Sequence, residues 1–270
     1  MCRLFGYRSN SLEPVHEALV SERNSLRHQS LEHKDGWGIA SYGAKPLPDV
    51  ARGLGAAHAD PEFERVSNQL SAHTVIAHVR LASVGRVMVE NAHPFVHEAW
   101  SFAHNGTLRD WSRHGSALEA RIAPDLRSSL RGSTDSERCF YLFLTHLRAV
   151  PEGWRSAETV ARALVRTIRE VSALTDEPDA PPSSMNFMVS NGELLVVTRR
   201  HRTLYYTARD ANNAAVDAPL RPGMTVRDLI VASEELWGGE PWFPISEDHV
   251  MGVDGDMVFR LWPFGELPPP

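Results

Sequence analysis

The strand-like segments of this sequence occur in clusters and do not alternate one by one with helical segments. Strict alternation would predict a parallel sheet, whereas clustered strands favour antiparallel sheets with helices packed outside them. The runs with strand character cover residues 2–9, 73–83, 99–106, 185–192, 192–200, 203–208, 229–234, 248–254 and 256–263. Asn191-Gly192 between two of these runs is a strong hairpin signal. The sequence therefore predicts an α+β architecture built on antiparallel sheets.

Three segments have apolar residues at helical spacing. Residues 134–150 begin with Thr134 and Glu137 at the spacing of a capping box, which predicts a helix with a defined start. Residues 156–174 predict a second long helix with a single apolar stripe, and residues 14–26 predict a helix with Pro14 in its first turn. The run at 2–9 predicts a short strand with a kink at Gly6.

The chain length and the short Pro-rich segments favour one domain. A chain of 270 residues is enough for one large domain or two small ones with a substantial core. The Pro-rich segments 177–184 and 267–270 predict irregular structure, and the first is too short to link independent units. We therefore expect a single domain over residues 1–270.

Charge and composition exclude several classes of function. The net charge of −6 argues against nucleic-acid binding by bulk electrostatics. No uncharged apolar run is long enough to span a membrane, and the N-terminus lacks the apolar segment of a signal peptide. Two cysteines cannot build a disulfide framework, which fits a reducing compartment. These features predict a cytoplasmic protein without nucleic-acid or membrane partners.

Cys2 directly follows the start methionine, and Cys139 is the other cysteine of the chain. Removal of Met1 is expected because residue 2 is small, and it would leave Cys2 with both an α-amino group and a thiol. The pKa of an α-amine is about 7.7–8.0 and that of a thiol about 8.5, so proton exchange between them is easy. The amine can therefore act as general base for its own nucleophile. The alternative is that Cys2 is a small buried hydrophobe.

Three other stretches carry residues with both a chemical and a structural interpretation. Arg80 ends a predicted strand, where its guanidinium can bind a carboxylate or pair with an internal acid. Asn105-Gly106 offers two convergent donors, as an oxyanion hole requires, but the same pair is typical of a hairpin turn. Asp135 lies in the first turn of the predicted helix, where it can hold a substrate ammonium or simply stabilise the helix end.

Together these segments resemble the class II glutamine amidotransferase domain of the N-terminal nucleophile hydrolase superfamily, in its short, stand-alone form. The resemblance rests on motifs that occur in the family's order within the first half of the chain. They are Met1-Cys2, "HKDGWGIA" (33–40), "AHVRLASVG" (77–85), "NAHPF" (91–95), "AHNG" (103–106) and "TDSE" (134–137). The resemblance implies a four-layer αββα sandwich of two antiparallel sheets flanked by helices.

The resemblance also implies roles for individual residues. Cys2 would be the nucleophile, Asn105 and Gly106 the oxyanion hole, Arg80 the ligand of the substrate α-carboxylate and Asp135 that of its α-ammonium. The motifs near the site contribute His93, Asp35, Gly36 and Gly38, for which no defined chemical role is implied. Larger synthases of the family carry Arg-Trp-Ala-Thr-His-Gly where this chain has residues 80–85, Arg-Leu-Ala-Ser-Val-Gly. The missing Trp and His put coupling to an ammonia channel in question.

The expected activity is cleavage of the γ-carboxamide of glutamine, or of a γ-glutamyl amide, through a thioester on Cys2. Alternatives are a γ-glutamyl amide hydrolase of an ergothioneine-type pathway and a catalytically silent binding protein. No cofactor is expected, and no metal either, because the 13 histidines form no HExxH and Pro94 interrupts His93 and His97. The partners would be a small-molecule substrate and, if ammonia is the product, an ammonia-accepting synthase. Cys139 falls on the predicted helix and is expected to be packed and inert.

Overall fold

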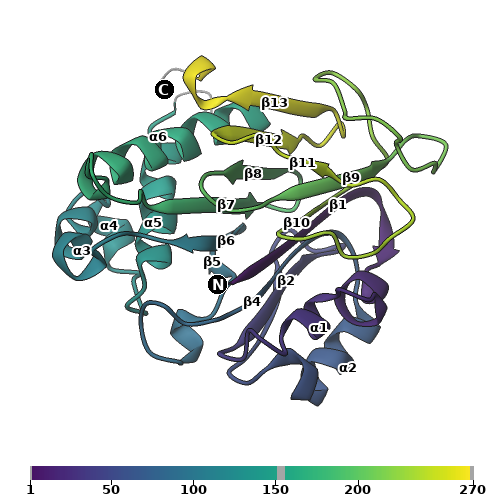
Figure 1. The fold of residues 1–270 in the computed structure, drawn as a ribbon, viewed down its shortest axis with the longest axis horizontal. Coiled ribbons are helices and arrows are strands. Elements are labelled where there is room, and N and C mark those ends of the chain that lie inside the picture. The colour runs from purple at the N-terminus through teal and green to yellow at the C-terminus, as the bar shows by residue number, and fades with distance from the viewer. Residues whose placement is uncertain (1, 151–155, 268–270) are drawn as a thin grey trace.

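Two antiparallel sheets lie face to face at the centre of the molecule, and helices cover both outer faces (Figure 1). The structure is a computed structural model that describes residues 2–150 and 156–267. The expected state of Met1 and the irregular tail at 268–270 lie outside the described residues. The prediction of an α+β fold with two antiparallel sheets and flanking helices is confirmed.

The first sheet has seven strands in the order β11-β9-β10-β1-β4-β2-β3, and β1 lies at its centre. Its strands are β1 (Arg3–Pro14), β2 (Trp37–Tyr42), β3 (Asp49–Gly53), β4 (Ser71–Val79), β9 (Tyr205–Arg209), β10 (Asp228–Ala232) and β11 (Phe243–Pro244). The second sheet has six strands in the order β13-β12-β8-β7-β6-β5. Its strands are β5 (Phe95–His97), β6 (Trp100–Thr107), β7 (Ser184–Ser190), β8 (Leu195–Arg199), β12 (His249–Val253) and β13 (Phe259–Pro263).

The helices segregate by sheet. The first sheet is covered by α1 (Leu26–Gln29) and α2 (Pro61–Gln69), and the second by α3 (Trp111–Glu119), α4 (Pro124–Arg127), α5 (Asp135–Arg148) and α6 (Ala157–Thr175) (Figure 1). Single turns occur at η1 (Glu17–Ser21), η2 (Ala57–Ala59), η3 (Val89–Asn91) and η4 (Phe264–Glu266). Within the described residues, no helix is both long and apolar enough to cross a lipid bilayer.

Three apolar cores follow from the alternation of side chains along the central strands. Leu4 of β1 and Ile76 of β4 point between the sheets, where they join Met188 of β7. Phe5 of β1 points to the opposite face, against α1 and α2. The third core lies between the second sheet and helices α5 and α6. Each sheet is thus buried on both faces, which produces four layers.

Helix α5 begins at the cap that the sequence predicts, and α6 also begins with a capping side chain. Thr134 Oγ1 accepts a hydrogen bond from the Glu137 N–H (3.2 Å), and Ser156 caps α6 in the same way. The Glu137 carboxylate does not complete the capping box, because it accepts from the N–H groups of Arg131 (2.8 Å) and Gly132 (2.9 Å). The predicted turn at Asn191-Gly192 is also present, joining β7 to β8 with Gly192 at φ 92°.

Two local predictions at the N-terminus are wrong. Residues 14–26 do not form one helix, because β1 continues to Pro14 and only the single turn η1 and the start of α1 follow. Pairing of the end of β1 with Ser71 of β4 outweighs the helical pattern there. Gly6 produces no kink, since it pairs regularly with both neighbours and the register shift falls between Arg8 and Glu13. Its lack of a side chain instead leaves room for Met188 across the sheet interface.

Candidate active site

Cys2 directly precedes β1, the central strand of the first sheet, and this strand runs through the middle of the molecule (Figure 1). Its thiol is within 3.6 Å of the Leu81 carbonyl oxygen, just beyond the end of the neighbouring strand β4. Two cavities adjoin this residue, and both are lined by Cys2, Leu81, Ser83 and Gly106. The thiol therefore stands between two distinct sets of side chains.

The first cavity contains the two charged residues singled out in the sequence. Arg80 and Asp135 both line it together with His93, His104 and Ser136. Its volume is about 10 Å³, which is enough for one water molecule and too small for an amino acid. A substrate of that size can enter only if part of the wall moves.

Arg80 is buried at the end of β4 and holds the exposed loop that follows it. Its guanidinium donates to the carbonyl oxygens of Val84 (2.8 Å) and Arg86 (3.2 Å). Burial lowers the pKa of Arg80, and the nearby Cys2 thiol and Asp35 carboxylate oppose this effect. The hydrogen bond to Val84 therefore links the position of the loop to the position of the Arg80 guanidinium.

Asp135 is buried at the first residue of α5. One carboxylate oxygen accepts from the Leu108 N–H (2.9 Å), and the other from the Ser136 N–H (2.9 Å). The Ser136 hydroxyl lies between this carboxylate (3.3 Å) and Nδ1 of His104 (2.9 Å). These bonds hold a negative charge rigidly at the wall of the first cavity.

Asn105 and Gly106 are strand residues and not a hairpin turn. They belong to β6 and pair with Asn186 and Met185 of β7. Both line the second cavity. Asn105 Nδ2 donates to the Ser233 hydroxyl (3.1 Å), and among the described residues no acceptor is recorded for its second hydrogen.

Gly106 is required by the sheet itself. A Cβ at this position would lie 1.9 Å from the Ser184 carbonyl oxygen and 2.4 Å from Nε2 of His104. The space that a side chain would need is thus filled by the neighbouring strand. The backbone of Gly106 still borders both cavities.

The other motif residues hold the backbone around the site in place. The Asp35 carboxylate accepts from the Ala82 N–H (2.8 Å), which fixes the start of the loop after Arg80. Gly36 has φ 129°, and its carbonyl accepts from the Arg80 N–H (2.8 Å). A Cβ on Gly38 would lie 2.1 Å from the His93 carbonyl oxygen, so only glycine lets β2 pass this close. The structure therefore brings all of the predicted residues to one region.

The second cavity is larger, with a volume of about 130 Å³. Besides the residues shared with the first cavity, it is lined by Ala82, Asn105, Thr107 and Arg202. The hydroxyl groups of Ser83 and Thr107 lie 3.1 Å apart at its wall. Arg202 comes from the turn between β8 and β9, about two hundred residues after Cys2.

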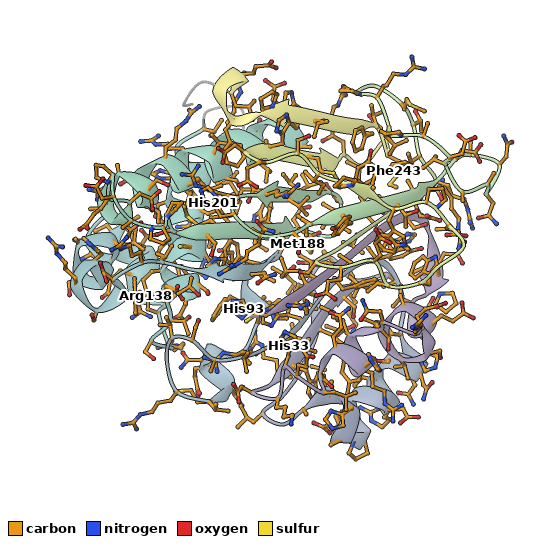
Figure 2. The ribbon with its side chains drawn as sticks, in the orientation of Figure 1. His33, His93, Arg138, Met188, His201 and Phe243 are labelled. Atoms are coloured by element: carbon orange, nitrogen blue, oxygen red, sulfur yellow. The ribbon has the colours of Figure 1, made fainter. Side chains whose placement is uncertain are left out.

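A cluster of buried histidines adjoins the first cavity. The ring of His93, labelled in Figure 2, lies 4.2 Å from that of His78 between ring centroids, and neither ring has a hydrogen-bond partner among the described residues. Burial lowers the pKa of His78 to about 3 and that of His93 well below its ordinary value. Burial also lowers the pKa of His104, whose Nε2 lies 3.0 Å from the Ser184 carbonyl oxygen. All three are therefore neutral near pH 7.

This cluster predicts acid sensitivity. An unfolded histidine binds a proton below about pH 6.5, whereas folded His78 does so only near pH 3. The contribution of neutral His78 to stability is therefore fully present above pH 6.5, and it should fall by about 1.4 kcal/mol per pH unit as the pH drops from there toward 3. We expect His78→Leu to show a shallower fall in urea midpoint between pH 7 and 5, while exposed His28→Leu keeps the wild-type slope. Equal slopes in all three proteins would contradict the assignment.

The surroundings of the Cys2 thiol do not favour a resting thiolate. Burial raises its pKa, and the opposing effects of the Leu81 carbonyl contact and the Arg80 charge are smaller. A base must therefore remove the proton during attack. His93 and His104 are poor candidates because burial lowers their pKa values. Cys139 is buried in the helical core and its pKa is raised, which fits the expected inert role.

Several residues at the site are not among those predicted from the sequence. His104 immediately precedes Asn105 in a quoted motif, and Ser136 follows Asp135, so motif position could have drawn attention to both. Ser233 and Arg202 are far from every motif. Arg202 is one of three arginines within residues 199–202, and nothing local distinguishes it from the others.

Among the described residues, no group of three or more His, Cys, Asp or Glu side chains is arranged to hold a metal ion.

The fold and the composition of the site define the class of protein. A four-layer αββα sandwich with a cysteine at the head of a central strand is the arrangement of the N-terminal nucleophile hydrolases that the motifs resemble. The sequence profile of the class-II glutamine amidotransferases matches residues 1–259. This chain therefore belongs to the class-II glutamine amidotransferases, a family of amidohydrolase-type enzymes.

Individual relatives show how far the similarity extends. The yeast (Saccharomyces cerevisiae) protein named "Probable glutamine amidotransferase DUG3" is 26% identical over 229 residues, covering 74% of this chain and 63% of the relative. This chain thus spans less than two thirds of that protein's length. The gamma-glutamyl-hercynylcysteine sulfoxide hydrolase of Mycobacterium tuberculosis is 30% identical over 118 residues, covering 40% of this chain and 50% of the relative.

A solved structure supports the fold. The glutamine aminotransferase class-II domain protein from Silicibacter pomeroyi superposes with a TM-score of 0.69 at 21% identity, and the match covers 100% of both chains. At this level of identity the likeness concerns the fold alone. It agrees with the four-layer arrangement described above.

Proposed function

We propose that this protein is a cysteine-dependent amidohydrolase that cleaves the γ-carboxamide of glutamine or of a γ-glutamyl amide through a thioester on Cys2. One observation carries the proposal. The Cys2 thiol stands between a cavity with a buried cation and a buried anion, Arg80 and Asp135, and a cavity bordered by Asn105 and Gly106. That arrangement suits a substrate with a carboxylate and an ammonium at one end and an amide at the other.

The charged pair would orient the substrate. Arg80 would exchange its contact with the Val84 carbonyl for the substrate α-carboxylate, which allows the loop after Arg80 to move outward. The α-ammonium would bind the Asp135 carboxylate, which its backbone donors hold in place. Fixing both ends aims the γ-carbonyl at the thiol, and such orientation can lower a barrier by as much as about 7–11 kcal/mol.

The reaction would proceed in two steps. The Cys2 sulfur bonds to the γ-carbonyl carbon, and the negative oxygen is stabilised by the Asn105 amide and the Gly106 backbone, each donor contributing about 2.7–4 kcal/mol. The C–N bond then breaks, and the leaving nitrogen takes the proton that came from the thiol. Water attacks the thioester, the C–S bond breaks, and glutamate is released.

The base in this proposal is the α-amine of Cys2, which removal of Met1 would free. Two observations support this choice. The raised pKa of the thiol requires a base, and the histidines that line the first cavity have lowered pKa values. An amine with a pKa of about 7.7–8.0 is matched to the task.

Further features of the proposal concern substrate and context. A γ-glutamyl amide of an ergothioneine-type pathway is the alternative substrate, supported by similarity to the hydrolase of M. tuberculosis.

We also propose that residues 1–270 act as one catalytic domain in the cytoplasm and that no cofactor takes part. If ammonia is the product, a synthase would accept it. A silent binding protein that keeps the fold is the alternative from another class.

The proposal predicts processing, labelling and turnover. Intact-mass spectrometry should show the purified protein without Met1. A diazoketone analogue of glutamine should add one label, and the label should be absent in Cys2→Ala. Glutamate release from glutamine and from N-substituted γ-glutamyl amides then identifies the substrate. A processed chain that takes no label and hydrolyses none of these substrates would favour the silent binding protein.

A further inference from the structure

Arg202 lines the cavity beside Cys2, and its side chain has no partner among the described residues. Among the described residues, no hydrogen bond or ion pair is recorded for this side chain, and its Nε is buried. A cation that is partly removed from water without an anion costs free energy. The arrangement therefore indicates that the anion comes from a bound molecule.

The neighbouring arginines behave differently. Arg199 lies 3.5 Å from the carboxylate of Glu247. Arg200 lies 2.9 Å from a carboxylate oxygen of Asp248 and also pairs with Asp176. The nearby carboxylates thus pair with the other two arginines of this segment. Of the three arginines, Arg202 is the one that lines the cavity.

The turn that carries Arg202 is held firmly. Its carbonyl oxygen accepts from Asn186 Nδ2 (3.2 Å) and from Arg199 Nε (3.0 Å). The N–H of the preceding residue, His201, donates to the Glu247 carboxylate (2.5 Å), and His201 is labelled in Figure 2. A fixed backbone keeps Arg202 beside the cavity before any ligand binds, which reduces the backbone entropy lost on binding.

Arg202 lies on the leaving-group side of the proposed reaction. The Arg80 and Asp135 cavity would take the glutamyl part of the substrate, and the thiol stands where the two cavities meet. The nitrogen that leaves the γ-carbonyl would therefore point into the cavity lined by Arg202. Whatever is attached to that nitrogen would meet this side chain.

The size and charge of this cavity do not match ammonia as the leaving group. Its volume of about 130 Å³ far exceeds the roughly 10–15 Å³ that one water-sized molecule requires. None of the described residues that line it carries a carboxylate, and Arg202 gives this lining a positive formal charge. The hydroxyl groups of Ser83 and Thr107 add polar contacts. A polar substituent with a negative charge fits these properties.

We propose that Arg202 binds a carboxylate of the leaving amine, so that the preferred substrates are γ-glutamyl amides of amino acids or peptides. The proposal rests on the amidohydrolase function proposed above. The γ-carbonyl carbon forms a bond to the Cys2 sulfur while its bond to the amine nitrogen breaks. The thiol proton reaches that nitrogen, and the amino acid departs with its carboxylate on Arg202. Water then releases glutamate from the thioester.

The test compares two substrates that differ in one group. γ-Glutamylglycine carries a carboxylate where γ-glutamylglycinamide carries a neutral amide. Hydrogen bonds to charged groups contribute about 1.5–3 kcal/mol, so we expect kcat/KM to favour the carboxylate about 10-fold or more. In Arg202→Met the ratio should approach one, and in Arg202→Lys it should be intermediate. Exposed Arg221→Met, a change of the same charge elsewhere, should keep the wild-type ratio.

Failure of this inference can be separated from failure of the proposed function. Hydrolysis of both substrates with a ratio near one in the wild type, or with equal ratios in wild type and Arg202→Met, overturns the role of Arg202 alone. Absence of any hydrolysis by the processed chain overturns the proposed function. In that case calorimetric titration of Cys2→Ala with both ligands decides about Arg202. Tighter binding of γ-glutamylglycine, lost when Arg202→Met is added, supports the inference, and equal binding rejects it.

Discussion

Replacing Cys2 with alanine is expected to reduce hydrolysis of glutamine and γ-glutamyl amides by about 10⁴-fold or more. The substitution removes the sulfur that forms the thioester, and loss of a covalent nucleophile has effects of this size in other hydrolases. The charged pair and the donors of the second cavity stay in place. Substrate binding should therefore persist while turnover disappears, which steady-state kinetics and calorimetry together measure.

Cys139→Ala is the matched control for this experiment. It removes the other thiol of the chain, which is buried between helices of the second sheet. The variant should lose some stability through the small cavity it creates but keep its turnover. Comparable activity of Cys2→Ala and the wild type, with the variant correctly folded by circular dichroism, would show that the chemistry lies elsewhere.

Replacing Asp135 with asparagine should lower kcat/KM for glutamine by about 10²- to 10³-fold. The amide side chain would present one oxygen and no charge to the α-ammonium, and leaving one partner of a buried ion pair alone costs about 3–5 kcal/mol. 4-Carbamoylbutanoate is the same molecule without the ammonium, so the wild type should hydrolyse it about 10²-fold less efficiently. In Asp135→Asn the two substrates should differ by less than about threefold.

Glu137→Gln provides the control for Asp135→Asn. Glu137 is a buried acid of the same helical turn, but it caps the N–H groups of Arg131 and Gly132 and does not line either cavity. Its substitution should reduce stability and keep the preference for glutamine over 4-carbamoylbutanoate. If Asp135→Asn also keeps that preference, Asp135 supports the helix end and does not bind the ammonium.

Much of the fold could be predicted because its signals are local. The caps at Thr134 and Ser156 satisfy backbone groups within three residues of themselves, so they mark the helix starts without tertiary contacts. The failure at residues 14–26 has the opposite cause. Pro14 pairs with Ser71 on a strand far along the chain, and this pairing outweighs the local helical spacing.

The candidate site could be predicted only in part, because some features of its residues depend on contacts between distant strands. Asn105-Gly106 ends a predicted strand and resembles a hairpin turn because turn statistics are local, whereas its pairing with β7 shows that the strand continues through it. The glycine at position 106 is likewise dictated by the Ser184 carbonyl oxygen, which lies where a side chain would be. Both features arise from contacts with a strand more than seventy residues away.

The sequence alone determined which reactive groups the chain carries and which local elements hold them, with Cys2 ahead of a strand and Asp135 at a helix start. Strand periodicity and helix capping depend on neighbouring residues, so they can be read along the chain. Only the tertiary structure decided that Arg80, Asp135 and Cys2 share one region, and that Arg202 lines the cavity beside Cys2 without a partner among the described residues. Such placement depends on pairing and packing between distant segments, which no local pattern encodes.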